Sequence, residues 1–437
     1  MKNILYIAYY YPPMQSGGTL RSEKFVKYLK RAGYRVFVLT ATYGKTRMDG
    51  RAGTIRVKDI SHNKNRRGLG KAKWFILRIW TETCQRCGHY HSIYHWWRQS
   101  VWRRRDEIMA LAEPDIIIAT YPPVETLEIG LRLHETFQVP LIADFRDGLL
   151  FESIEKRLLD RSKVVREHYT GLEKRAARES ALVSTVSEPI TNYFLEHYPG
   201  CHAKTIYTGF DPDDVSEVKP RPITAKDNIF QIVYTGRVSL SDSSSSLKSF
   251  VFAMQSLLRK RPETATRIRF RIAGEMSRKE RKLLQPFVRM GVVTLCGLLN
   301  RKDALALQQE ADLLLLITST TRTSVVTTKV FEYLLAGRPF LALSKRNTAV
   351  AQIILDTRSG WIVHPENLEQ IQARLEAILQ NTDSMDAVNR DEARINRYST
   401  KNQITRLDGQ IKKILRGPFS AQCSSAGHPG DHSAGSG

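Results

Sequence analysis

The sequence lacks long apolar runs and has few cysteines. Its five cysteines are an odd number, which does not indicate a framework of disulfides. The most apolar run, Leu313 to Ile317, is far shorter than the roughly 20 residues that span a bilayer. The N-terminal stretch has a short apolar run and no small-residue cleavage site, so it does not resemble a signal peptide. We therefore expect a reduced, cytoplasmic protein whose contact with any membrane is peripheral.

Acidic residues are outnumbered by basic ones. The 437 residues include 67 Lys and Arg against 44 Asp and Glu, a net charge of +23. This charge favours anionic partners such as phosphates, nucleic acid or acidic lipid headgroups, and charge alone does not choose among them. A hydrophobic content of 42% excludes global disorder, and the length is too great for one ordinary core. We expect two domains.

The first part of the chain alternates between apolar strands and amphipathic helices. An apolar run over 4–10 precedes a glycine-containing turn, a helix over 19–33 and a strand over 35–41, which together form a βαβ unit. The same alternation returns further on and continues to residue 210. We predict a Rossmann-like domain over 1–210 with five or six parallel strands, carrying a basic, Trp-rich insert at 62–105.

The alternation restarts after a segment without apolar periodicity. Residues 211–228 mix Pro, Asp and Lys as a linker does, and residues 229–396 then predict a second Rossmann-like domain. We expect a helix at 397–416 that returns to the first domain, and a disordered tail at 417–437. The predicted fold class is α/β, with two tandem parallel-sheet domains facing a cleft at the carboxyl ends of their strands.

The first turn between strand and helix carries adjacent glycines. In PPMQSGGTLRSEK, Gly17 and Gly18 let the backbone approach a ligand closely, while the following helix N-terminus offers free N–H groups. A turn that merely joins a strand to a helix explains the same residues. No GxGxxG dinucleotide fingerprint is present.

The second predicted domain offers cations at its strand ends. Arg237 ends the strand in YTGRVS and Lys248 opens the next helix, so both are candidates for a diphosphate, although a solvated charge pair is the alternative. In TSVVTTKVFEYLLAGRP, the loop with Thr328 and the side chain of Lys329 suit phosphates, and Glu332 suits a ribose diol. Alternatively, Glu332 is only an exposed helix residue.

The segment DFRDG places Asp144, Arg146 and Asp147 at the carboxyl end of a predicted strand. In one interpretation they are catalytic: one Asp accepts or orients the proton of an acceptor hydroxyl, while Arg146 pairs with the other carboxylate and lowers its pKa. In the other, a buried Asp–Arg pair braces the loop.

Together these segments resemble family 4 of the retaining, nucleotide-sugar-dependent glycosyltransferases, which have the GT-B double Rossmann fold. The matching segments are YPPMQSGGTLR, IADFRDG, TVSEPI, YTGFDP, YTGR and KVFEYLLAGRP, and they span nearly the whole chain. The resemblance implies that Gly17 and Gly18 lie near the donor diphosphate and the acceptor. It also implies that Arg237 and Lys248 bind the phosphates and that Glu332 binds the donor ribose.

The sequence departs from the usual family pattern in two places. Ser324 stands where the first of two family glutamates is expected, although Lys329 and Glu332 fit the subgroup with a Lys-x-x-Glu-Tyr-Leu helix. Gly148 and Leu149 replace the Pro and Trp that commonly follow the second Asp of the DFRDG segment in that subgroup.

The resemblance also implies a reaction course. The acceptor attacks from the face that the nucleotide leaves, so the anomeric configuration is retained. Arg237, Lys248, Lys329 and loop amides stabilise the leaving phosphate, so we expect neither a metal nor another cofactor.

The insert at 62–105 combines basic residues with tryptophan, which suits the interface of an anionic membrane and a lipid-linked acceptor. The alternatives are a helical hairpin packed on its own domain and single-stranded nucleic acid stacked on the aromatic rings. The residues assigned to this surface are Trp74, Trp80, Trp96, Trp97, Trp102, Arg103 and Arg104.

Within the insert, Cys84, Cys87, His89, His91 and His95 lie close together in sequence. A CxxC followed by histidines can bind zinc, but the long spacing between ligand pairs that is typical of zinc fingers is missing. We expect no metal site here.

Our first hypothesis is a glycosyltransferase of bacterial surface polysaccharide synthesis. It uses a nucleotide-diphosphate-sugar and a lipid-linked or polysaccharide acceptor on the inner face of the plasma membrane. A nucleotide-sugar epimerase of the same fold is the second hypothesis and would turn over the nucleotide-sugar without an acceptor. A non-enzymatic nucleic-acid-binding protein is the third and would bind generic DNA or RNA in a salt-dependent way.

Overall fold

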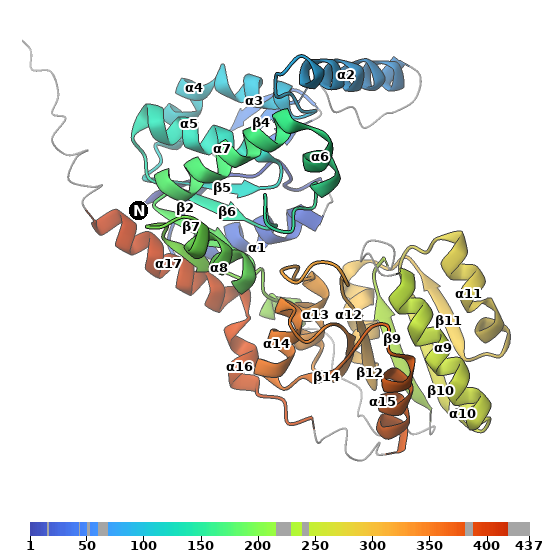
Figure 1. Ribbon diagram of the computed structural model, residues 1–437. Coiled ribbons are helices and arrows are strands. Elements are labelled where there is room, and N and C mark those ends of the chain that lie inside the picture. The colour runs from blue at the N-terminus through green and yellow to red at the C-terminus, as the bar shows by residue number, and fades with distance from the viewer. Residues whose placement is uncertain are drawn as a thin grey trace, which may run out of the picture. The chain divides into compact units, whose positions relative to one another are not determined.

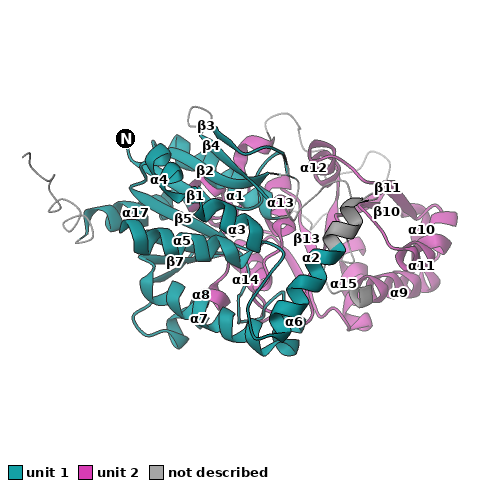
Figure 2. Ribbon diagram, turned by 90° about the horizontal axis from the view of Figure 1, so that it is seen from above, with its two compact units in different colours: residues 1–185, 191–206, 404–437 teal, residues 186–190, 207–403 magenta. Residues whose placement is uncertain are grey.

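The computed structural model describes residues 1–14, 17–42, 44–49, 53–59, 69–215, 229–237, 244–380 and 388–417. They form two compact units, shown in separate colours in Figure 2. Unit 1 comprises residues 1–185, 191–206 and 404–437, and unit 2 comprises residues 186–190 and 207–403. Most of the predicted linker, nearly all of the predicted tail and the first part of the insert lie outside the described residues.

Unit 1 contains an eight-stranded sheet with the order β3-β4-β2-β1-β5-β6-β7-β8. All neighbouring strands are parallel except β3 and β4, which pair antiparallel. In the central strand β1, Leu5 lies opposite Phe37 of β2 and Ile117 of β5. The strands are β1 (Asn3–Ile7), β2 (Arg35–Thr42), β3 (Arg47–Asp49), β4 (Thr54–Lys58), β5 (Ile116–Tyr121), β6 (Leu141–Phe145), β7 (Leu182–Thr185) and β8 (Ala203–Thr205).

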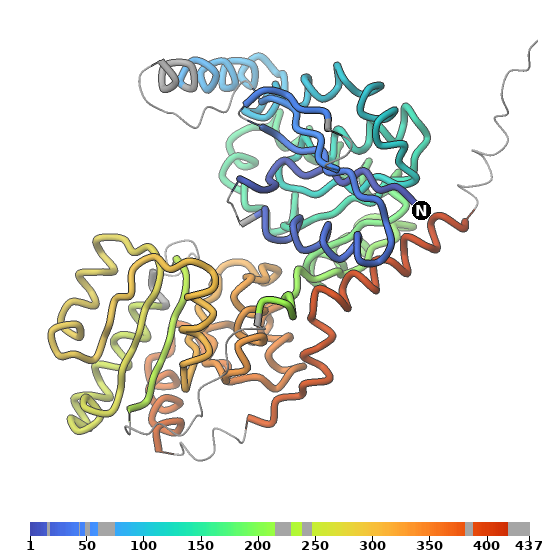
Figure 3. The backbone as a smooth tube through the Cα atoms, turned by 180° about the vertical axis from the view of Figure 1, so that it is seen from behind, coloured from blue at the N-terminus to red at the C-terminus, as the bar shows by residue number. Residues whose placement is uncertain are grey.

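Helices cover both faces of this sheet, as Figure 1 shows. On one face, apolar residues of α1 and Ile404, Leu407 and Ile411 along α17 share a core with β1, β2 and β5. Figures 1 and 3 show α17, in red, beside the blue N-terminal segment, and Tyr34 Oη donates a hydrogen bond of 2.7 Å to Asp408. The helices are α1 (Gly17–Arg31), α2 (Leu69–Arg86), α3 (His95–Trp102), α4 (Arg105–Ala112), α5 (Val124–Phe137), α6 (Lys156–Arg161), α7 (Lys163–Glu179), α8 (Glu188–His197) and α17 (Thr400–Arg416).

Unit 2 contains a six-stranded sheet with the order β11-β10-β9-β12-β13-β14, and all of its neighbouring strands are parallel. Strand β12 consists of four leucines and one isoleucine and is fully buried, as expected for a strand covered on both faces. The strands are β9 (Phe230–Thr235), β10 (Ile268–Ala273), β11 (Val293–Gly297), β12 (Leu313–Ile317), β13 (Phe340–Leu343) and β14 (Gly360–Val363).

Two separate cores lie on the two faces of this second sheet. One contains apolar residues of α9, α11 and α15, and the other contains those of α12, α13, α14 and α16. The helices are α9 (Ser244–Lys260), α10 (Thr264–Arg267), α11 (Arg278–Arg289), α12 (Arg301–Gln309), α13 (Thr328–Ala336), α14 (Ala349–Thr357), α15 (Leu368–Gln380) and α16 (Glu392–Arg397), with the 3-10 turn η1 (Pro212–Val215) before the first strand.

The strand orders confirm the predicted fold class of two α/β domains with parallel sheets. The sequence did not predict β3 and β4, because these strands are short and half polar. The order reverses between β1 and β5 in unit 1 and between β9 and β12 in unit 2. Ligands of open parallel sheets bind at the carboxyl ends of the strands beside such a reversal. None of the described helices is long and apolar enough to cross a membrane.

Candidate functional site

In unit 1, the start of α1 meets the end of β6. A Cβ atom on Gly18 would collide with Nη1 of Arg146 and lie 3.0 Å from its Nη2, so a larger residue would require this guanidinium to shift. Arg146 donates hydrogen bonds to the carbonyl oxygens of Gly18, Tyr121 (3.1 Å) and Pro122 (2.6 Å). The predicted residues Gly18 and Arg146 therefore lie together at the reversal between β1 and β5. Gly17 is the first residue of α1.

Asp144 forms a buried ion pair with Arg21, a residue that the sequence analysis did not single out. Oδ1 accepts from Arg21 Nη2 (2.6 Å) and Ser184 Oγ (2.8 Å), and Oδ2 accepts from Arg21 Nε (3.1 Å) and Thr120 Oγ1 (2.8 Å). Burial raises the pKa of Asp144, but the Arg21 guanidinium and the two hydroxyls outweigh it and lower that pKa below its ordinary value.

This geometry favours the bracing interpretation for Asp144, with Arg21 as the partner in place of Arg146. Asp144 is 1% exposed, and each carboxylate oxygen already accepts two hydrogen bonds. Asp147, in contrast, is half-buried beside Arg146. A Cβ on Gly148 would overlap the backbone of Phe151, which explains glycine in place of proline at this turn. The catalytic roles stay predictions.

In unit 2, Lys329 joins the end of β9 to the start of α13. Its ammonium donates a 2.7 Å hydrogen bond to the hydroxyl of the buried Tyr234 and lies 4.6 Å from the centre of that ring. Gly236 has a φ of 110°, and a Cβ there would collide with the Lys329 side chain. Burial lowers the pKa of Lys329 to about 8, and the nearby charge of Glu332 opposes that shift.

The N-terminal half of α13 carries the other predicted donor residues, Thr328 and Glu332. Thr327 caps the helix by accepting from the backbone N–H of Lys329, so the helix starts at Thr328, and Gly337 ends it with a φ of 75°. Glu332 lies three positions after Lys329 on the same helix face and is half-buried.

Two further positions near α13 have structural roles. Tyr333 Oη donates to the carbonyl of Leu315 (3.1 Å) and accepts from Thr235 N–H (3.4 Å), which fixes α13 against β12 and β9. Ser324, at the position of the first family glutamate, is only 2% exposed. A glutamate at this position would place a larger, charged side chain where the serine is almost fully buried.

Arg237 follows β9 and is exposed, where it forms an ion pair with Glu275 after β10. The sequence analysis did not single out Glu275, which stands two residues after the end of β10. Lys248 is exposed on α9, and its ammonium lies 5.4 Å from the ring of Phe252. The structure therefore brings Lys329 and Glu332 together but shows no interaction between Lys248 and them in the part of the chain that it describes.

The basic, Trp-rich insert is partly a surface and partly core. Trp97 is fully buried, with its ring 5.0 Å from that of Tyr9, so its assignment to a membrane surface is wrong. Trp102 is half-buried under the guanidinium of Arg132, at 3.8 Å. Trp96 is half-buried as well. Helical periodicity alone did not reveal which face packs against α5.

The other residues that the sequence analysis assigned to a membrane surface are exposed or have side chains outside the described set. Arg103 and Arg104 are exposed, and Trp80 on α2 is 54% exposed, whereas the side chain of Trp74 is outside the described set. Beside Trp80, α2 also exposes the apolar side chains of Phe75 (60%), Ile76 (64%) and Ile79 (48%), which the sequence analysis did not name.

The cysteines and histidines of the insert do not gather around a common point. His91 and His95 stack with ring centroids 4.2 Å apart, and Thr81 Oγ1 lies 3.1 Å from Nδ1 of His91. Among the described residues, no group of three or more His, Cys, Asp or Glu is placed to hold a metal ion.

A comparison with known protein families finds a match within unit 2. Residues 229–381 match the family described as glycosyl transferases group 1. The matched segment contains β9, α13 and the residues Arg237, Lys329 and Glu332 described above. A search of curated protein sequences gives no significant match to the chain.

Solved structures resemble the whole chain. Sucrose-phosphate synthase from Thermosynechococcus elongatus is 14% identical with a TM-score of 0.67, over 96% of this chain and 100% of that chain. HepE from Anabaena in complex with UDP and glucose is 15% identical with a TM-score of 0.57, over 94% and 100%. Trehalose-6-phosphate synthase, in a study of enzymatic glycosyl transfer with retention, is 14% identical with a TM-score of 0.62, over 94% and 99%. At these identities the likeness shows the fold, and it confirms the predicted GT-B architecture.

Proposed function

We propose that this protein is a glycosyltransferase that moves a sugar from a nucleotide-diphosphate donor to an acceptor with retention of anomeric configuration. The observation that carries the proposal is the cation Lys329, fixed by Tyr234 and Gly236 at the strand reversal of a domain that matches glycosyl transferases group 1. The structural neighbours HepE, seen with UDP and glucose, and trehalose-6-phosphate synthase, studied for transfer with retention, support the donor class and the stereochemistry.

In this proposal, Lys329 and Arg237 bind the donor diphosphate and Glu332 binds the ribose. The ion pair between Arg237 and Glu275 is exposed, so a diphosphate that replaces Glu275 as the partner has little desolvation to overcome. Lys248 and the N–H groups around Thr328 add to the phosphate site. These cations stabilise the leaving diphosphate, a task that a metal ion performs in other enzymes.

Unit 1 supplies the acceptor side in the same proposal. Gly17 and Gly18 present the N-terminus of α1 at the strand reversal, where its N–H groups suit an anionic or hydroxyl-bearing substrate. Asp147 orients the acceptor hydroxyl, and Arg146 holds the surrounding carbonyls in place. Asp144 supports the site because its ion pair with Arg21 holds α1 against β6.

We further propose that the acceptor is lipid-linked and that the protein works on an anionic membrane, on the inner face of the plasma membrane, in the synthesis of a bacterial surface polysaccharide. The support is the apolar stripe of α2, where Phe75, Ile76, Ile79 and Trp80 are 48–64% exposed on one helix face. A monomeric protein rarely leaves such a contiguous apolar stripe in water, and exposed Arg103 and Arg104 add positive charge nearby in the sequence.

The donor assignment is tested by a thermal-shift screen with UDP, GDP, ADP and CMP. A nucleotide present at about a hundred times its dissociation constant stabilises the folded protein by about 2.7 kcal/mol, and we expect this for one nucleotide diphosphate. Glu332→Ala should remove most of the shift, whereas Glu263→Ala, an exposed glutamate of the same unit, should keep it. If no nucleotide changes the melting temperature of the wild type, the donor assignment is wrong.

The membrane assignment is tested by flotation with vesicles of phosphatidylglycerol and phosphatidylcholine. At about 0.5 M salt, which screens the attraction between charges, we expect wild-type protein to float with the vesicles and the double variant Phe75→Ser/Trp80→Ser to stay at the bottom of the gradient. Leu298→Ser, which changes an apolar residue of unit 2 that is 77% exposed, is the matched control and should behave as wild type. Equal flotation of all three proteins would exclude α2 as the membrane contact.

A further inference from the structure

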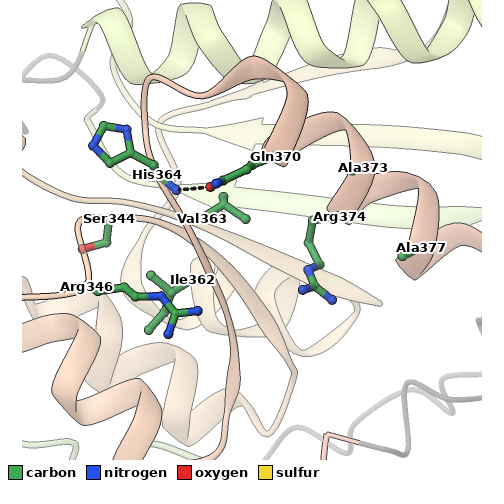
Figure 4. A pocket seen from close by; sticks show the side chains of 9 residues that line it. All are labelled: Ser344, Arg346, Ile362, Val363, His364, Gln370, Ala373, Arg374 and Ala377. Atoms are coloured by element: carbon green, nitrogen blue, oxygen red, sulfur yellow. Dashed lines mark hydrogen bonds between the residues drawn. The ribbon is translucent and has the colours of Figure 1, made fainter.

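Unit 2 contains a pocket that none of the proposed donor residues lines. It has a volume of about 660 Å³ and lies at the carboxyl ends of β13 and β14, beside α15 (Figure 4). Known small-molecule pockets enclose roughly 300–1,000 Å³, and the carboxyl ends of parallel strands are where α/β domains bind ligands. The pocket therefore has the size and the place of a binding site.

Two arginines give the pocket its charge. Arg346 comes from the loop after β13, and Arg374 comes from α15. Figure 4 shows the Arg346 side chain extending toward Ile362 and the Arg374 side chain descending from α15, whereas the imidazole of His364 turns away from both. No carboxylate lines the pocket, and among the described residues none forms an ion pair with either arginine. Both arginines are exposed, so an anion reaches their guanidinium groups directly from solvent.

Four of the other seven lining residues are apolar, and the remaining three are the polar residues Ser344, His364 and Gln370. Ile362 and Val363 of β14 lie on one side, and Ala373 and Ala377 of α15 lie on the other. The alanine side chains leave the space that larger side chains on this helix face would fill. The pocket thus combines two guanidinium groups with an apolar wall, which suits a ligand that has an anionic head and an apolar body.

This pocket is separate from the proposed donor site. Lys329 and Glu332 lie on α13, which follows β12, and Gly236 follows β9, whereas the pocket lies over the last two strands of the sheet. None of these three residues lines it. A ligand can therefore occupy it together with the donor.

We propose that this pocket binds an organic phosphate monoester, with Arg346 and Arg374 on the phosphate and the apolar wall against the organic group. A phosphate monoester near neutral pH carries close to two negative charges, which match two guanidinium groups, and arginine binds phosphate through paired N–H groups. A carboxylate has only one charge and leaves one arginine uncompensated.

Titration calorimetry with phenyl phosphate as the probe tests this proposal on the full chain. We expect Arg346→Gln/Arg374→Gln to weaken phenyl phosphate binding at least about tenfold, which is about 1.4 kcal/mol. The matched control is Arg267→Gln/Arg289→Gln, two exposed arginines elsewhere in unit 2, and it should bind like the wild type. Ala377→Leu, which fills the pocket and keeps both charges, should weaken phenyl phosphate and leave inorganic phosphate unchanged.

The other arms of the experiment identify the ligand class. Benzoate binding as tightly as phenyl phosphate would overturn the phosphate assignment, and inorganic phosphate binding as tightly would overturn the role of the apolar wall. Equal binding by the Arg346/Arg374 variant and its control would place the ligand elsewhere. Glu332→Ala should not change phenyl phosphate binding, so the failure of this proposal and the failure of the donor assignment can be told apart.

Discussion

The half-buried Lys329 holds its ammonium group over the ring of Tyr234, donates a hydrogen bond to that tyrosine's hydroxyl, and lies next to Gly236. Water solvates a charge better than this environment does, so burial lowers the pKa of Lys329 to about 8. An anionic diphosphate favours the protonated lysine, and its binding should raise this pKa. In the proposed donor site, the charge of Lys329 would therefore couple donor binding to pH within an accessible range.

We predict that the affinity of the wild type for its nucleotide diphosphate falls as the pH rises through about 8. Once the lysine is largely neutral, at about pH 9, the loss should approach tenfold. Lys329→Met should bind weakly at every pH and show no such fall. Titration calorimetry between about pH 7 and about pH 9 measures both proteins, and an equally steep fall in Lys329→Met would assign the titration to another group.

The ion pair between Arg21 and Asp144 is 2% exposed on each side and links α1 to β6. We predict that Asp144→Ala lowers the free energy of unfolding by about 3–5 kcal/mol, because it leaves a buried guanidinium without its partner. The double variant Arg21→Met/Asp144→Ala should lose less. Urea unfolding of the two variants measures this difference, and equal losses would contradict a coupled pair.

The lowered pKa of Asp144 adds a pH dependence with a definite sign. The ionised form is favoured in the folded state, so this stabilisation is present above the pKa of the unfolded chain. It is lost as the pH falls through the folded value. The double variant should lack this part of the acid sensitivity.

At the scale of elements, α5 packs directly against the sheet of unit 1 through a glycine. A Cβ on Gly130 would lie 2.7 Å from the Cβ of Ala119 in β5 and 3.1 Å from Leu141 Cδ1 in β6. In contrast, a Cβ on Gly171 in α7 would meet no atom within 4 Å. The position of α5 matters because the turn before it provides the carbonyls of Tyr121 and Pro122 that hold Arg146.

We predict opposite effects for the same substitution in these two helices. Gly130→Ala should destabilise the protein by about 1–3 kcal/mol through overpacking, whereas Gly171→Ala should stabilise it by about 0.5–1 kcal/mol by favouring the helix. Thermal and urea unfolding measure both changes. Stabilisation by Gly130→Ala would show that α5 can move away from the sheet at little cost.

At the scale of the whole molecule, the excess of 67 Lys and Arg over 44 Asp and Glu determines which surfaces the protein approaches. Each Lys or Arg near an anionic membrane contributes about 1 kcal/mol, and salt screens this attraction over about 10 Å at 0.1 M. In the proposed membrane contact, the apolar stripe of α2 would contribute through burial, which salt does not screen.

We therefore predict that vesicle binding has a salt-sensitive and a salt-insensitive part. The bound fraction of the wild type should fall as salt rises from about 0.05 M to about 0.5 M and then level off, whereas Phe75→Ser/Trp80→Ser should fall to zero. Cosedimentation with anionic vesicles measures both curves. A wild-type curve that also reaches zero would mean that charge alone holds the protein on the membrane.

The sequence by itself determined the fold class and part of the candidate site. Runs such as Leu313–Ile317 predict buried parallel strands because only a strand covered on both faces is apolar throughout. The order of strands and helices along the chain then limits the topology to two doubly wound sheets. Arg237, Lys329 and Glu332 were identifiable because they stand directly at predicted strand ends and helix starts.

Only the tertiary structure decided which partners these residues have and which aromatic residues are buried. The pairs Arg21–Asp144, Tyr234–Lys329 and Arg237–Glu275 join residues that are far apart in sequence. Trp97 and Trp80 occupy similar basic segments, yet one is fully buried and the other is 54% exposed. Local periodicity fixes how side chains are arranged around one element. Whether a side chain is buried, and which residue it pairs with, depends on the elements that pack against its own element. Those elements come from distant parts of the sequence.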